Sequence, residues 1–83
     1  MPGAPAPGRG LARHERLELL YAELEAGLQA VSFLHGDEAP AMMRRLRRML
    51  GRAALDDDEV QILLGVARQM TWAGTLARAQ LLN

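Results

Sequence analysis

The sequence predicts an all-α protein, a small three-helix bundle that follows a disordered N-terminal linker. Apolar residues make up 49% of the 83-residue chain, yet Phe, Tyr and Trp occur only once each. Leu and Ala supply most of the apolar positions, and this mixture favours helices over strands. Three segments repeat apolar residues at steps of three and four, the spacing of one helical face. A single domain of this size buries little surface, so we expect a partner or a second copy.

The first ten residues, MPGAPAPGRG, hold all but one of the prolines and three glycines. Such a stretch cannot bury apolar area, which predicts a flexible linker at residues 1–10. The helical domain is then expected over residues 11–83.

The first helix is predicted at about residues 11–32. Its apolar face consists of Leu17, Leu20, Leu24, Leu28 and Val31. The polar segment HGDEAP interrupts this pattern, and Pro40 suits the first turn of the next helix because its missing N–H would be unpaired there.

The second helix is predicted at about residues 40–54, and its charged and apolar residues separate completely. At 100° per residue the apolar arc spans roughly 140° and the arginine arc roughly 160°. The apolar arc contains Met42, Leu46, Met49, Leu50 and Ala53, with Met43 and Ala54 at its edge. The opposite arc contains Arg44, Arg45, Arg47, Arg48 and Arg52.

The third helix is predicted at about residues 57–73, because Asp56 and Glu59 can form a capping box. Its apolar arc contains Val60, Leu63, Leu64, Ala67 and Met70, flanked by Ile62 and Val66. Gly74 is expected to weaken the helix, and the following ARAQLLN to continue or fray. Trp72 lies outside the apolar arc. Such an indole could stack on a base or fill a dimer contact, but a neighbouring helix covers it more often.

Composition excludes several kinds of site. Without cysteine there is no disulfide, thiolate metal site or thiol nucleophile. His14 and His35 lack the spacing of zinc ligands on one helix, and Ser32 has no sequence pattern of a catalytic triad. We therefore predict no catalytic, cofactor-binding or metal-binding residue. No apolar run reaches the ~20 residues of a membrane span, and the start lacks a signal sequence, which predicts a cytoplasmic protein.

The arginine arc has more than one interpretation. The chain is neutral overall, with ten basic and ten acidic residues. Composition alone favours a solvated face whose long side chains cover apolar neighbours. A surface for polyanions is the second interpretation, because phosphate contacts need little more than such a face. The remaining interpretations are that the arginine face binds an acidic protein partner or an anionic membrane surface.

The order of motifs resembles one known family. LYAELEAGL precedes SFL, then MRRLRRMLGRA, an acidic turn and EVQILLGV. This order over about residues 15–70 resembles the C-terminal extension of the TrmJ-type SPOUT-class tRNA ribose 2′-O-methyltransferases. Leu64 stands where that family usually has Arg, and TWAGTLARAQLLN has no counterpart in the pattern. Residues that match across the second and third helices are Leu46, Arg47, Arg48, Arg52, Ala53, Glu59, Ile62, Leu63, Gly65 and Val66.

The resemblance implies a tRNA-binding and dimer-assembly module whose catalytic knot domain lies elsewhere. That domain would bind S-adenosylmethionine, so we expect no cofactor in this chain. The expected partners are tRNA, the SPOUT catalytic domain and a second copy, with no membrane. Arg47, Arg48 and Arg52 match family arginines, whereas Arg44 and Arg45 join the RNA-binding set by helical geometry alone. The alternative is a helical protein-interaction module with a solvated arginine face.

Overall fold

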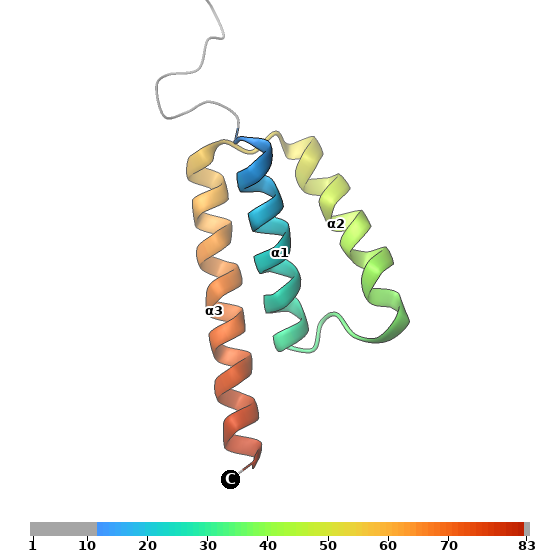
Figure 1. Cartoon of the computed structure of the whole chain (residues 1–83), viewed down its shortest axis with the longest axis vertical. Helices are drawn as coiled ribbons and strands as arrows, with labels where there is room; N and C mark the ends of the chain where they lie inside the picture. The colour runs from blue at the N-terminus through green and yellow to red at the C-terminus, as the bar shows by residue number, and fades with distance from the viewer. Residues whose placement is uncertain (1–11, 83) are drawn as a thin grey trace, which may run out of the picture.

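The computed structural model describes residues 12–82, which form three α-helices and one short 3₁₀ turn (Figure 1). In chain order these are α1 (His14–Ala30), η1 (Gly36–Glu38), α2 (Ala39–Ala53) and α3 (Asp57–Leu82). No strand occurs among the described residues, and the predicted all-α three-helix fold is confirmed. The linker predicted at residues 1–10 lies outside the described residues.

The helix α1 lies in the middle, with α2 on one side and α3 on the other (Figure 1). Two clusters of buried residues correspond to the two sides of α1. Leu20, Val60 and Leu64 join α1 to α3, whereas Tyr21, Leu34, Ala39 and Met43 join α1 to α2 and the loop before it. Leu17 packs against both clusters. The apolar core is therefore built on both faces of one central helix.

The capping box predicted for the third helix is confirmed. The Asp56 N–H donates to Glu59 Oε1 at 2.9 Å, and the Glu59 N–H donates to Asp56 Oδ1 at 2.8 Å. The two bonds satisfy backbone donors that the first turn of a helix leaves unpaired. Ala54 ends α2 with a φ of 52°, so the chain turns within a few residues from α2 into α3.

The helices α1 and α3 approach each other closely at two glycines. A Cβ atom at Gly27 would lie 2.6 Å from the carbonyl oxygen of Ala67, and one at Gly74 would overlap the backbone of Ala30. The expected end of the third helix near residue 73 was too early, since α3 continues to Leu82. Gly74 is the point of contact with α1, and this packing offsets its low helix propensity.

The helix α2 is rotated relative to the prediction. Ala39 and Met43 are buried and Leu46 and Leu50 half-buried, whereas Met49 is 55% exposed. The core-facing side is thus turned by roughly 40° at 100° per residue. The first helix is also shorter than expected, from His14 to Ala30. None of the helices in the described part is long and apolar enough to cross a membrane.

Candidate nucleic-acid interface

Four arginines form one exposed stripe on the outer side of α2. Arg44, Arg45, Arg48 and Arg52 are exposed, and no ion pair or hydrogen bond joins them to any residue from 12 to 82. They fall within an arc of roughly 100°, opposite the buried positions of the helix. From the first to the last they extend about 12 Å at 1.5 Å per residue. We call these four residues the arginine stripe.

Arg47, the fifth arginine of the predicted set, points elsewhere. Its Nη2 atom lies 2.9 Å from both carboxylate oxygens of Glu18, and its Cζ atom lies 4.5 Å from the centre of the Tyr21 ring. Glu18 and Tyr21 both belong to α1. Arg47 therefore attaches α2 to α1, and its charge is already paired within the fold.

Helical spacing could have identified this role. Arg47 follows Met43 by four residues and precedes Leu50 by three, and both of these pack on α1. Neighbours at such spacings share a helical face. The sequence interpretation grouped Arg47 with the other arginines because it centred the apolar face on Met42 and Met49.

The remaining ion pairs of the described residues also involve α1. Arg16 Nε lies 3.5 Å from Asp57 Oδ1, and Arg68 Nε lies 3.6 Å from Glu23 Oε1. Together with Arg47 and Glu18 they tie α1 to both neighbouring helices. The carboxylates of Glu18, Glu23 and Asp57 are thus paired with arginines outside the stripe.

The arginine stripe has like-charged neighbours and no acid among them. Arg44 and Arg48, and then Arg48 and Arg52, are four residues apart, and each such pair destabilises a helix by roughly 0.2–0.5 kcal/mol. Bound phosphates would relieve this repulsion, and arginine forks match phosphate oxygens in geometry. The stripe is therefore chemically suited to a polyanion.

Apolar side chains border one edge of the arginine stripe. Met42 and Met49 are partly exposed on α2, and Phe33 in the loop after α1 is 58% exposed. Phe33 and Met42 line one small depression together with Leu34, His35, Glu38 and Ala39, so its lining includes one carboxylate. Exposed aromatic rings can stack on unpaired bases.

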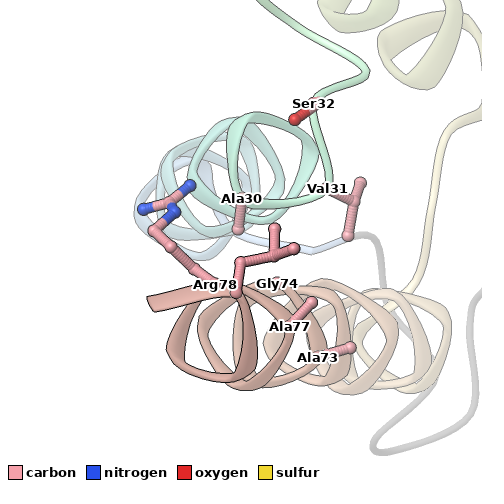
Figure 2. Close-up of a pocket in the computed structure, with 8 residues that line it drawn as sticks. Ala30, Val31, Ser32, Ala73, Gly74, Ala77 and Arg78 are labelled. Carbon is pink, nitrogen blue, oxygen red and sulfur yellow. The ribbon is translucent and has the colours of Figure 1, made fainter. Parts of the chain in front are cut away.

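A shallow groove of about 340 Å³ lies between the end of α1 and the C-terminal part of α3 (Figure 2). Half of its lining residues are Ala or Gly, and Arg78 reaches from α3 toward α1 (Figure 2). Ser32 supplies a hydroxyl. The groove has no carboxylate to hold the ribose hydroxyls of S-adenosylmethionine, so its residues do not fit that cofactor.

Trp72 is 61% exposed on the outer side of α3. The expectation that a neighbouring helix covers this indole was wrong, because α1 packs on the opposite side of α3 through Val60, Leu64 and Ala67. Ile62 and Val66, which flank the buried arc, are exposed as well.

Comparison with known proteins gives two matches. Residues 15–81 match the family described as tRNA methyltransferase TrmJ, C-terminal domain. The match extends past Thr71 and thus includes most of the TWAGTLARAQLLN stretch that the motif pattern left unmatched. The chain is also 41% identical over 56 residues to the tRNA (cytidine/uridine/adenosine-2′-O-)-methyltransferase TrmJ of Pseudomonas aeruginosa (strain UCBPP-PA14). That alignment covers 68% of this chain and 22% of the relative, so the chain spans about a fifth of its length. No solved structure matches the chain.

Proposed function

This chain belongs to the family of TrmJ tRNA methyltransferase C-terminal domains, and from that premise we propose that it binds tRNA through the arginine stripe of α2. The observation that carries the proposal is the set of four exposed arginines that have no ion-pair or hydrogen-bond partner among residues 12–82. Arg47 leaves the predicted RNA-binding set, since its charge is paired with Glu18.

The proposed contacts are mainly to phosphate. Four arginines on two turns of one helix can neutralise several phosphates of one strand, and such contacts position a protein without reading sequence. The apolar edge formed by Phe33 and Met42 would lie beside the strand and offer its surface to bases that are not stacked. We expect affinity to come from the arginines and any preference for unpaired nucleotides from this edge.

The rest of the proposed activity depends on a second domain. We propose that a SPOUT catalytic domain binds S-adenosylmethionine and transfers its methyl group to a ribose 2′-OH, while this module holds the tRNA. The proposed assembly is a homodimer, and a cytoplasmic location stays a prediction. The described residues 12–82 contribute binding and assembly to this reaction.

The test is a titration of labelled tRNA with the 83-residue chain at several salt concentrations. The affinity should fall as salt rises, with a slope near one per phosphate contact. A variant with Arg44, Arg45, Arg48 and Arg52 replaced by Glu should lose measurable binding at moderate salt. Circular dichroism of the variant should retain the helical spectrum, because all four side chains are exposed.

The matched control is Arg78→Glu, which makes the same charge change at an exposed arginine of α3, on the other side of α1 from α2 (Figure 1). It should leave the affinity within about twofold, because a distant exposed charge is screened within ~10 Å at ordinary salt. Equal losses for Arg48→Glu and Arg78→Glu would show that only total charge matters and would contradict a defined interface. Absence of binding by the unmodified chain at low salt would favour the alternative, a protein-interaction module with solvated arginines.

A further inference from the structure

The outer side of α3 carries apolar residues that nothing in the described chain covers. Ile62 is 66% exposed and Trp72 61%, and Val66 and Leu76 are nearly half exposed. At 100° per residue, these exposed side chains lie on the side of α3 opposite the buried residues Val60, Leu64 and Ala67, so they point away from α1. We call the surface formed by Ile62, Gly65, Val66, Gln69, Trp72, Ala73 and Leu76 the outer α3 face.

This face has no charged residue, which is unusual for the solvent side of a helix. A shallow groove of about 590 Å³ runs along one side of it, lined by Val31, Gly65, Val66, Gln69, Met70 and Ala73. The four large side chains expose on the order of 400 Å² of apolar surface, a size that marks interaction sites on monomers.

The order of residues along the outer α3 face is nearly the same in both directions. Counting outward from Gln69, small residues stand four positions away on each side (Gly65 and Ala73), and aliphatic residues seven positions away (Ile62 and Leu76). Val66 and Trp72 stand three positions away. An isologous contact about a two-fold axis needs this kind of self-complementarity.

The difference in charge between the two ends of α3 favours an antiparallel arrangement. The first turn carries Asp57, Asp58 and Glu59, whereas residues 79–82 at the other end of the helix carry no charge. Parallel pairing would set two acidic turns side by side, whereas antiparallel pairing sets each beside the C-terminal part of its neighbour. Opposed helix dipoles add to this preference.

We propose that two copies of this chain associate through the outer α3 face, antiparallel, with the two Gln69 residues at the centre. Ile62 of each copy then packs against Leu76 of the other, and Val66 against Trp72. Gly65 and Ala73 let the helix backbones approach closely. The inference rests on the dimer assembly proposed above and names its surface, and it is independent of the arginine stripe.

The expected dimer is of moderate strength. The paired faces span about 21 Å of helix at 1.5 Å per residue. They would bury about 1,000 Å² in total, the lower bound of specific interfaces. We therefore expect dissociation in the micromolar range for the isolated chain.

Sedimentation equilibrium of the 83-residue chain, from low micromolar to about 1 mM, tests the association. Ile62→Glu should raise the dissociation constant at least about tenfold. The double variant Ile62→Glu with Leu76→Arg should restore association, because antiparallel pairing brings each Glu beside an Arg. Thr75→Glu, on the same helix but outside the outer α3 face, is the matched control and should leave the dissociation constant of the dimer unchanged. Circular dichroism verifies that each variant keeps its helices.

Cysteine cross-linking tests the centre and the direction, since the chain has no cysteine of its own. Gln69→Cys should form a disulfide-linked dimer under mild oxidation, while Leu76→Cys should not. Equal cross-linking at both positions would mean parallel pairing and would overturn the proposal. A monomer at every concentration would also overturn it and leave the face to another segment of a longer protein. Neither result affects RNA binding by Arg44 and Arg48, so this inference and the tRNA proposal fail separately.

Discussion

The outer surfaces of α2 and α3 differ in chemistry although both helices pack against the same central helix. The outer side of α2 carries Arg44, Arg45, Arg48 and Arg52, and that of α3 carries exposed apolar residues such as Ile62 and Trp72. Folding needs only the inner sides, which supply the two buried clusters. The outward residues contribute little to the core, so their chemistry is the better guide to binding.

The two helices are also attached to α1 in different ways. Gly27 and Gly74 bring the backbones of α1 and α3 together, and no such close approach exists between α1 and α2 in the described chain. The contact of α2 depends on side chains, including Met43 and Arg47. Substitutions should therefore be more costly at the α1–α3 contact.

The largest effect is expected for Leu64→Ala. Leu64 is 1% exposed between α1 and α3, and its truncation should lower the free energy of unfolding by about 3 kcal/mol through lost burial and a cavity. Leu46→Ala makes the same change at a half-buried position of α2 and should cost about half as much. Urea denaturation measures both. Equal losses of unfolding free energy for the two variants would contradict a stronger attachment of α3 than of α2 to α1.

A second comparison uses one chemical change at two glycines. Gly74→Ala should destabilise the chain by about 1–3 kcal/mol, because its Cβ would overlap the Ala30 backbone. Gly51→Ala on α2 should stabilise it by about 0.5–1 kcal/mol, since a Cβ there meets nothing and Ala favours helix. Thermal unfolding gives the sign of each change. A stabilising Gly74→Ala would mean that α1 and α3 lie further apart.

A third pair of variants separates the arginines of α2. Arg47→Ala should cost about 1 kcal/mol of stability, a modest value because its pair with Glu18 is partly solvated and the ring contact with Tyr21 adds little more. Arg48→Ala should be neutral or stabilise by a few tenths of a kcal/mol, because it removes two like-charge neighbours. Arg47→Ala should lower the free energy of unfolding more than Arg48→Ala does, whereas Arg48→Ala should weaken tRNA binding more. The same order in both would place Arg47 in the binding surface.

A similarly small effect on stability is expected for Trp72→Ala, which should change the free energy of unfolding by less than about 0.5 kcal/mol because the indole is mostly exposed. The fluorescence of the unmodified chain provides the second measurement. Its emission should shift to shorter wavelength as concentration rises, since dimer formation would cover Trp72. An emission maximum that stays constant from micromolar to millimolar chain would argue against burial of this residue by a second copy.

Local sequence signals accounted for the helices and for most of the arginine stripe. Asp56 and Glu59 located the start of α3, because a capping box acts over only four residues. Arg44, Arg45, Arg48 and Arg52 were identified as an exposed face from helical spacing alone. Helical spacing could also have placed Arg47 beside Met43, but centring the apolar face on Met42 and Met49 obscured it.

Local sequence signals could not predict the contacts between helices. Gly74 was expected to weaken the last helix, yet it marks a close approach to Ala30, a residue 44 positions earlier in the chain. The helix continues to Leu82 because packing against α1 outweighs the low propensity of one glycine. Trp72 was expected to be covered because a neighbouring helix usually covers such an indole, but α2 packs on the other side of α1 and leaves it exposed (Figure 1).

The sequence by itself determined the all-α class, the start of α3 and the separation of charged from apolar residues on α2. These features depend on propensity, capping and periodicity, which act between residues a few positions apart. Only the tertiary structure decided that Arg47 is paired with Glu18, that Gly74 contacts α1 and that no other part of residues 12–82 covers the outer α3 face. Each of these depends on how whole helices pack, and packing is set by contacts between residues far apart in the chain.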